Sequence, residues 1–151
     1  MGSITRELLI EASPEVVFDV VSSPEHVEQW WADEARFSAT PGVEGELAFK
    51  GESGAELLAH LTVLDADPPR LFSFRWCYEA GVTPAEGNSM LVTFELAPTA
   101  SGTLLRMTES GFREMGWEAA VLEAQYTEHV DGWNKFLLRL NDYGNKVGSQ
   151  Q

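Results

Sequence analysis

The chain has 151 residues, of which 44% are hydrophobic and 23% are charged, an ordinary balance for one globular domain with a buried core. Acidic residues outnumber basic ones by 24 to 10, so the formal net charge is −14. Such a field repels phosphate backbones and anionic lipid surfaces, and we therefore expect no nucleic acid and no membrane as partner.

The single cysteine, Cys77, excludes an intramolecular disulfide and a cysteine-based zinc site. The sequence shows no basic segment followed by an apolar one, the pattern of a secretory signal peptide. It also shows no apolar run near 20 residues, the length that a membrane-spanning helix needs. We therefore expect a cytoplasmic location. The sequence shows no set of metal ligands and no cofactor-binding motif, so we expect no bound metal and no cofactor.

The N-terminal part predicts one strand and two short helices. Residues 4–12 alternate and then become apolar, as a strand does. The motif Ser-Pro-Glu then occurs twice, at residues 13–15 and 23–25. Each copy combines an N-cap hydroxyl, a proline at the first helical position and an acid near the positive helix end. We expect a short helix after each.

The middle of the chain predicts a series of strands joined mostly by hairpins. Apolar residues alternate at about 46–50, 57–63, 72–78, 90–96 and 105–109, and turn residues separate these segments. Proline interrupts the pattern after Asp67, because proline cannot donate to a sheet. Cys77 falls on the face opposite Trp76, which suggests an inert thiol rather than a nucleophile. Arg75 and Arg106 also fall on outward faces and are expected in solvent.

The last third predicts one long helix from Gly116 to about Tyr143. Its apolar stripe recurs at steps of three and four residues. A helix of about 28 residues is about 42 Å long at 1.5 Å per residue, enough to span a whole sheet. Gly132 within it suggests a kink or a close approach of the sheet. The stripe consists of Leu122, Tyr126, Val130, Trp133, Leu137 and Leu140.

This order of elements indicates an α+β protein. We expect a helix-grip: a curved antiparallel sheet of six to seven strands wrapped on a long C-terminal helix, with two short helices after the first strand. A sheet of this size curls because each strand adds roughly 20–25° of twist. The expected domain covers residues 1–147, and residues 148–151 are expected to form a disordered tail.

In this order of elements and in five segments, the sequence resembles the SRPBCC (START and birch-pollen-allergen-like) superfamily. Within it, the sequence is most similar to the family of homologues of the activator of heat-shock-chaperone ATPase. The resemblance covers most of the chain in the expected order. It implies a hydrophobic cavity for a small molecule, and it carries no family-wide catalytic motif. The segments that carry it are IEASPEVVFDVVSSPEHVEQWW (10–31), PGVEGELAF (41–49), DPPRLFSFRW (67–76), SGTLLRMTESGF (101–112) and DGWNKFLLRL (131–140).

Aromatic residues are numerous enough to line such a cavity as well as to fill a core. The residues expected to contact a ligand lie on the inward strand faces, on the second short helix and along the long helix. They are Trp30, Trp31, Phe49, Phe74, Trp76, Met107, Glu109, Phe112, Tyr126, His129 and Trp133.

Glu109 and His129 are the two candidates for acid–base chemistry. Glu109 shares a strand face with Leu105 and Met107, so it is either a buried polar group that must be bonded or the end of the strand at a wet cavity mouth. His129 lies one turn before Trp133, so it either lines the cavity or reaches solvent at the edge of the stripe. His26 is expected on the solvated surface of the second short helix, and His60 is expected outside the cavity.

Three functions are compatible with these patterns. The first is binding of a small hydrophobic or aromatic molecule between sheet and helix. The second is an enzyme that uses Glu109 and His129 as an acid–base pair on a polyketide-like or aromatic substrate. The third is a stress-associated, co-chaperone-like interaction module with a filled interior. A homodimer is compatible with all three.

Overall fold

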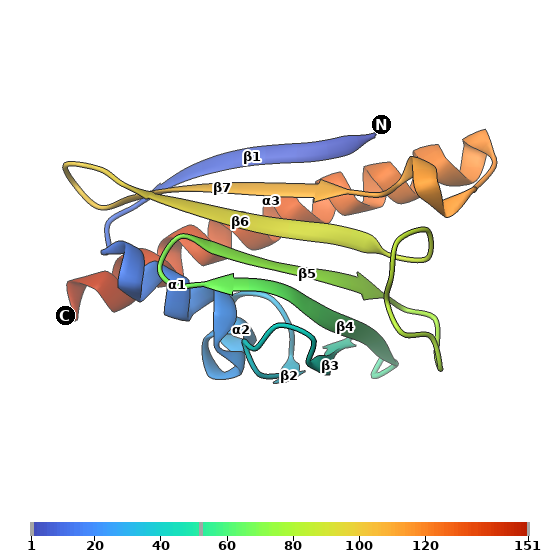
Figure 1. Cartoon of the computed structure of the whole chain (residues 1–151), viewed down its shortest axis with the longest axis horizontal. Helices are drawn as coiled ribbons and strands as arrows, with labels where there is room; N and C mark the ends of the chain where they lie inside the picture. Colours follow the sequence, from blue (N-terminus) through green and yellow to red (C-terminus); the bar gives the residue numbers. More distant parts are fainter. Residues whose placement is uncertain (1, 52, 151) are drawn as a thin grey trace.

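The computed structural model describes residues 2–51 and 53–150. Seven strands with two short helices after the first of them come before one long C-terminal helix in the described part of the chain (Figure 1). The elements are β1 (Ser3–Ile10), α1 (Pro14–Ser22), α2 (Pro24–Trp30), β2 (Glu34–Arg36), β3 (Glu44–Lys50), β4 (Glu56–Asp67), β5 (Leu71–Cys77), β6 (Met90–Pro98), β7 (Thr103–Ser110), the 3-10 helix η1 (Arg113–Met115) and α3 (Ala119–Ser149).

The seven strands form one antiparallel sheet in the order β1-β7-β6-β5-β4-β3-β2. The first strand therefore pairs with the last, and Ile4 lies opposite Glu109. The predicted α+β class, the sheet, the two short helices and the long helix are confirmed. The sequence analysis missed β2, because three residues are too few to show an alternating pattern.

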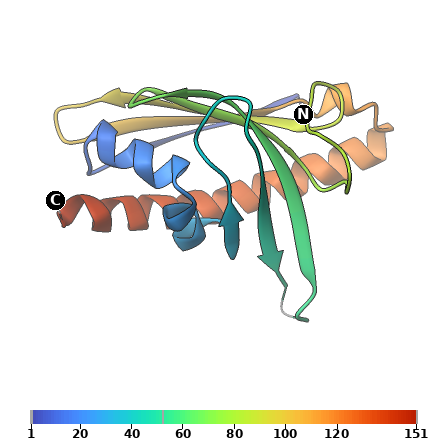
Figure 2. The ribbon, with the colours of Figure 1, turned by 60° about the horizontal axis from the view of Figure 1, so that its bottom comes forward.

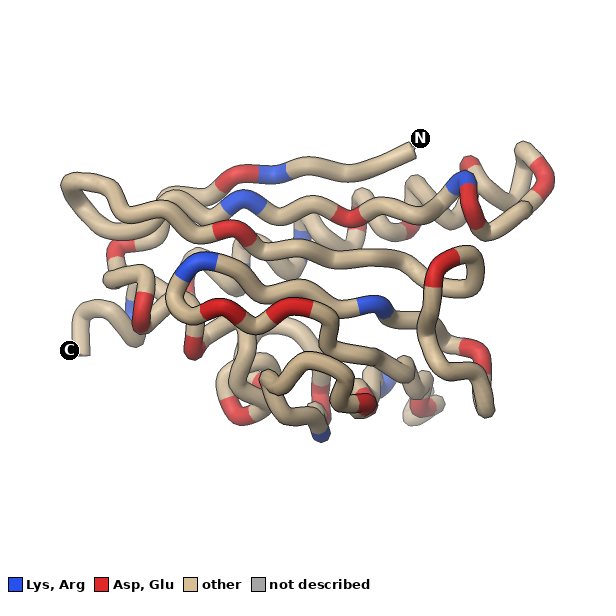
Figure 3. The backbone as a smooth tube through the Cα atoms, viewed as in Figure 1, with Lys and Arg blue, Asp and Glu red and all other residues tan. Residues whose placement is uncertain are grey.

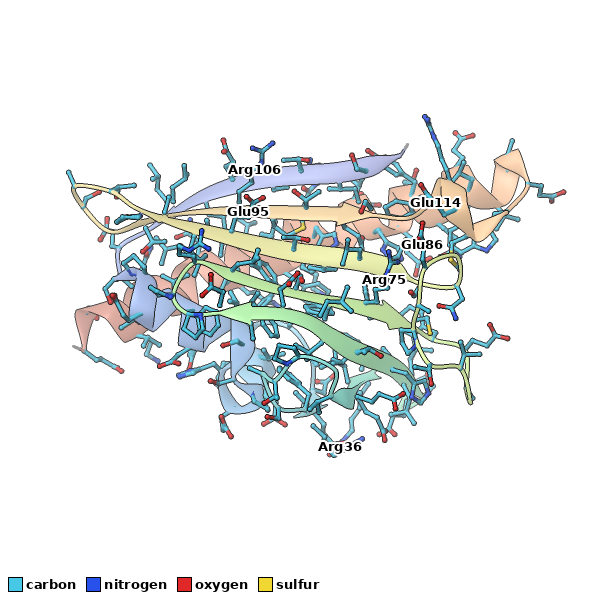
Figure 4. The ribbon with its side chains drawn as sticks, viewed as in Figure 1. Arg36, Arg75, Glu86, Glu95, Arg106 and Glu114 are labelled. Atoms are coloured by element: carbon cyan, nitrogen blue, oxygen red, sulfur yellow. The ribbon has the colours of Figure 1, made fainter. Side chains whose placement is uncertain are left out.

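All three α-helices lie on the same face of the curved sheet, with α3 crossing beneath it and the β3–β4 hairpin bending toward the helices (Figure 2). The opposite face of the sheet carries charged side chains, among them Arg75 and the register pair Glu95 and Arg106 (Figure 4). Acidic residues are spread over the strands, loops and helices rather than gathered at one place (Figure 3). The outward placement of Arg75 and Arg106 agrees with the prediction.

Both Ser-Pro-Glu motifs start helices, but only the first uses its serine as predicted. Ser13 Oγ accepts a hydrogen bond from Val16 N at 3.3 Å. Ser23 has extended backbone at the N-cap of α2 but makes no side-chain cap. The proline at the start of each helix and the acid in its first turn are therefore the features that the two starts share.

The long helix begins later and ends later than predicted. Gly116, with φ +74°, ends η1 and separates it from α3, which runs from 119 to 149. Gly148 and Ser149, expected in a disordered tail, are thus helical, while Gln151 lies outside the described residues. The stripe points inward as predicted: Trp133, Leu137 and Leu140 are buried, and Leu122, Tyr126 and Val130 pack partly buried against the core.

The close approach of α3 to other backbone and core atoms occurs at Gly144, beside β1, and at Gly148, beside the turn after β1, and not at Gly132. A Cβ at Gly144 would lie 2.8 Å from Ile10 Cγ2, and one at Gly148 would collide with the backbone carbonyl of Glu11. At Gly132 the nearest such atom is Phe136 Cε2, at 3.9 Å. Gly132 therefore faces free space.

Candidate functional site

The centre of the site is the side chain of Glu109 on β7. Alternate residues of this strand, Thr103, Leu105, Met107 and Glu109, point to the helix side of the sheet and are fully buried. Glu109 has no exposed surface, and β7 continues to Ser110. The alternative that the strand has ended and that Glu109 lies in water at a cavity mouth is therefore wrong.

Three N–H groups face the buried carboxylate. Trp76 Nε1 donates to Oε2 at 2.8 Å, Trp133 Nε1 donates to Oε1 at 2.8 Å, and His129 Nδ1 lies 2.7 Å from Oε1. A carboxylate without such partners would be very costly to bury, whereas hydrogen bonds to a charged acceptor are among the strongest in proteins. The three contacts also connect β5, β7 and α3 through one side chain.

His129 and Trp133 reach the same oxygen because they are four residues apart on α3 and project from the same helix face. The imidazole ring is held between Trp76 and Phe112, with ring centroids 5.6 and 5.2 Å away. Gly111 makes the turn after β7 possible, since its φ is +107° and a Cβ there would lie 2.9 Å from Ser89 O.

Only the Nδ1 side of His129 is occupied. The His129 side chain is 10% exposed. Among the described residues, Nε2 of His129 has no hydrogen-bond partner. The fully buried polar side-chain atoms without a partner in this part of the chain are Thr62 Oγ1 and Asn141 Oδ1, and Nε2 is not one of them. Nε2 is therefore neither paired nor sealed off by the protein, and the side chain that carries it lines the adjoining space.

That space is a pocket of about 230 Å³ between the β3–β5 part of the sheet and the middle of α3. Aromatic rings form most of its wall, and Tyr78, Glu128 and His129 supply its polar groups. The lining residues are Trp31, Phe49, Leu57, Trp76, Tyr78, Glu128, His129, Gly132, Trp133 and Phe136.

The structure brings about half of the predicted ligand-contacting residues to this pocket. The predicted residues that line it are Trp31, Phe49, Trp76, His129 and Trp133. Glu109 lies behind Trp76, His129 and Trp133, whose side-chain nitrogens contact its carboxylate. Five predicted residues do not line it. They belong to the packed interior or, in the case of Tyr126, pack partly buried against it: Trp30, Phe74, Met107, Phe112 and Tyr126.

These five side chains have other structural partners. Trp30 is 1% exposed and donates its indole hydrogen to Val20 O, and Tyr126 donates its hydroxyl to Ser3 O. Phe112 packs against Tyr126 and His129. An inward-facing position in the sequence therefore did not distinguish a side chain that fills the core from one that faces the pocket.

The prediction missed Leu57, Tyr78, Glu128, Gly132 and Phe136. Two of them carried a usable signal: Tyr78 continues the inward face of Trp76, and Gly132 interrupts an apolar helix face with no side chain. Tyr78 is 41% exposed at the pocket rim. Although the residue is partly exposed, the protein around its phenol group removes water from it, and this desolvation, with the nearby carboxylates of Glu109 and Glu128, raises the pKa of the phenol.

A second pocket of about 240 Å³ adjoins the first and shares Trp76, Tyr78 and His129 with it. Cys77 contributes to its wall and is buried, and burial raises the pKa of the thiol. This agrees with the prediction of an unreactive cysteine. The remaining lining residues are Glu79, Asn88, Ser89, Met90, Met115, Trp117 and Gln125.

The other histidines lie away from this site. His26 is half-buried, and its Nδ1 is 2.6 Å from the Tyr143 hydroxyl. His60 is on the face of β4 opposite Ala59 and Leu61, as predicted. Within residues 2–51 and 53–150, no group of three or more His, Cys, Asp or Glu residues could hold a metal ion. In the same part of the chain no helix is long and apolar enough to cross a membrane.

Comparison with known proteins identifies relatives of this fold. The family model described as Activator of Hsp90 ATPase homolog 1-like protein matches residues 11–145. Protein MLL2253 from Mesorhizobium loti is 23% identical with a TM-score of 0.74, and the alignment covers 95% of this chain and 97% of that one. Protein NE0264 from Nitrosomonas europaea is 16% identical with a TM-score of 0.78, over 97% and 96% of the two chains.

DynU16, a protein in the dynemicin biosynthetic locus, is 23% identical with a TM-score of 0.71 over 95% of this chain but only 47% of its own length. At these identities the likenesses establish the fold alone. No curated protein matches the sequence significantly.

Proposed function

The chain belongs to the family of Activator of Hsp90 ATPase homolog 1-like proteins in the SRPBCC superfamily, whose helix-grip is a ligand-binding fold, and we propose that it binds a small hydrophobic or aromatic molecule between the sheet and α3. The observation that carries this proposal is the unfilled, aromatic-walled pocket beside a fully buried Glu109. Small-molecule sites are typically concave and apolar with a few convergent polar groups.

The dimensions of the pocket restrict the ligand. Sites for drug-sized molecules are usually about 300–1,000 Å³, and the pocket here is about 230 Å³. A molecule of one or two fused rings suits it better than a long acyl chain. The rings of Trp31, Phe49 and Phe136 offer stacked or edge-on contacts to such a molecule.

Titration with naphthalene tests the proposal. Since Trp31, Trp76 and Trp133 line the pocket, we expect a change in tryptophan fluorescence, a rise in melting temperature, and a dissociation constant in the micromolar range, roughly −8 kcal/mol. A panel of fatty acids, flavonoids and small aromatic compounds that leaves both signals unchanged would exclude the proposal.

A pair of variants on α3 locates the binding. Gly132→Phe places a ring in the pocket and should abolish binding. Leu138→Phe places a ring on the solvent side of the same helix, where Leu138 is 68% exposed, and should leave binding unchanged. Equal affinity in the two variants would place the ligand elsewhere.

The contact between Glu109 and His129 supports a second candidate, an enzyme acting on a polyketide-like or aromatic substrate. His129 Nε2 would remove a proton from a carbon next to a carbonyl group, Glu109 would stabilise the resulting imidazolium, and the proton would return to the product. Exchange of that proton in deuterium oxide, followed by NMR with a small aromatic 1,3-diketone, tests this step. Exchange no faster with the protein than with its His129→Phe variant would exclude it.

The remaining expectations belong to the same proposal. The unfilled pocket favours ligand binding over a co-chaperone-like interaction module, which needs no such space. We propose a cytoplasmic protein without nucleic acid or membrane partners. A homodimer also belongs to the proposal, and sedimentation equilibrium would measure the oligomeric state.

A further inference from the structure

We infer that the pocket selects neutral aromatic molecules that carry a hydroxyl group, and that His129 Nε2 is the group that recognises the hydroxyl. This inference rests on the proposed function and deepens it, because it names the chemical class of the ligand. It follows from the fixed orientation of one imidazole ring and from the charges around it.

The orientation of His129 is determined from several sides. Glu109 Oε1 fixes Nδ1 at 2.7 Å, and the rings of Trp76 and Phe112 pack against the imidazole. Trp133 Nε1 and Trp76 Nε1 in turn fix the carboxylate. A ring held in this way presents Nε2 in one direction, so a hydrogen bond to it needs little further ordering.

A hydroxyl group suits Nε2 in either protonation state of the ring. When Nδ1 carries the only hydrogen, Nε2 has a lone pair and accepts a hydrogen bond from the hydroxyl. When both nitrogens are protonated, Nε2 donates to the hydroxyl oxygen instead. Ether and ketone groups can only accept, and so they suit one of the two states.

The surrounding charges disfavour a carboxylate ligand. Glu128 lines the pocket, Glu109 lies directly behind His129, and the chain carries a net charge of −14. No Lys or Arg is among the described residues that line this pocket or the adjoining one. The cations of Lys135 and Arg139 lie 5.3 and 5.6 Å from the centre of the Phe136 ring, but neither lines the pocket. A third carboxylate would therefore be desolvated near two others without a cation in the pocket wall to compensate it.

Three probes with the same ring system separate these contributions: naphthalene, 2-naphthol and 2-naphthoate. Isothermal titration calorimetry at pH 7 should give about 3- to 10-fold tighter binding for 2-naphthol than for naphthalene, the equivalent of one net hydrogen bond. We expect 2-naphthoate to bind more weakly than naphthalene.

His129→Phe keeps an aromatic ring and removes the nitrogens. Because the variant can no longer distinguish a hydroxyl group by hydrogen bonding, it should bring 2-naphthol and naphthalene to equal affinity. As a readout on the unmutated protein, the ¹⁵N resonance of His129 Nε2 should move on addition of 2-naphthol and not on addition of naphthalene. This measurement applies even where the variant fails to fold.

The outcomes distinguish the inference from the function on which it rests. If none of the three probes binds, the hydroxyl inference is overturned. The proposed function fails as well if the wider panel of fatty acids, flavonoids and small aromatic compounds also leaves fluorescence and melting temperature unchanged. If naphthalene binds and 2-naphthol binds no more tightly, the hydroxyl inference is overturned and the proposed function stands. Tightest binding of 2-naphthoate, or a 2-naphthol preference that persists in His129→Phe, overturns it as well.

Discussion

Replacing Gly132 by alanine should stabilise the protein, although glycine is often assumed to be essential where it interrupts a helix. The new Cβ would lie 3.9 Å from Phe136 Cε2, an ordinary van der Waals distance, and would meet no other group so closely. Alanine is favoured over glycine in a helix interior by about 1 kcal/mol. In a domain of this size, that gain raises the melting temperature by about 2–4 °C.

Gly144→Ala is the matched control on the same helix. Its Cβ would lie 2.8 Å from Ile10 Cγ2, well inside the optimum of about 3.5–4.0 Å for carbon atoms. Ile10 is 1% exposed and so has little room to move. Overpacking typically costs about 1–3 kcal/mol, which equals or exceeds the gain in helix propensity.

Urea unfolding of both variants, with the melting temperature as a second measure, provides the comparison. We expect Gly132→Ala to be more stable than Gly144→Ala by about 1–3 kcal/mol. The added methyl group should also weaken naphthalene binding, because Gly132 lines the pocket. Equal destabilisation by both changes would show that Gly132 does not face open space, and the pocket as described would be refuted.

Three further predictions follow from the buried groups and from the charge. Trp133→Phe should lower the free energy of unfolding in urea by about 1.5–3 kcal/mol, because it removes a hydrogen bond to the charged Glu109. Trp133→Ala should lower it by about 3–5 kcal/mol. A loss below about 1 kcal/mol in both variants would contradict the buried contact. Burial raises the pKa of Cys77, so at pH 8 its thiolate fraction is below that of a free cysteine. Cys77 should therefore react with Ellman's reagent much more slowly in the native protein than in the urea-unfolded protein. Equal reaction rates would be incompatible with the burial of the thiol. The net charge of −14 should prevent binding to DNA or RNA at physiological salt, and micromolar, salt-sensitive binding in a mobility-shift assay would be the opposite result.

Local patterns in the sequence determine most of the fold. Alternation places Leu105, Met107 and Glu109 on one face of β7, and the three- and four-residue spacing of α3 turns Trp133 and Leu137 inward. These patterns depend only on the geometry of a single strand or helix, and so they are readable without tertiary contacts. The boundaries of α3 are harder to predict from the sequence. Gly116 ends a separate 3-10 helix before α3 begins, and Gly148 lies within α3, where the helix packs against Glu11 and Ala12.

The candidate site was decided by tertiary structure. Glu109 is separated in sequence from Trp76 by 33 residues, from Trp133 by 24 and from His129 by 20, and only the sheet order and the crossing of α3 bring their N–H groups to one carboxylate. Periodicity shows that a side chain points inward, but it does not show whether packing leaves space beside it. Phe112 and Trp76 both point inward, yet the first is enclosed by the core and the second borders a pocket, because the volume left beside a side chain depends on every element that packs around it.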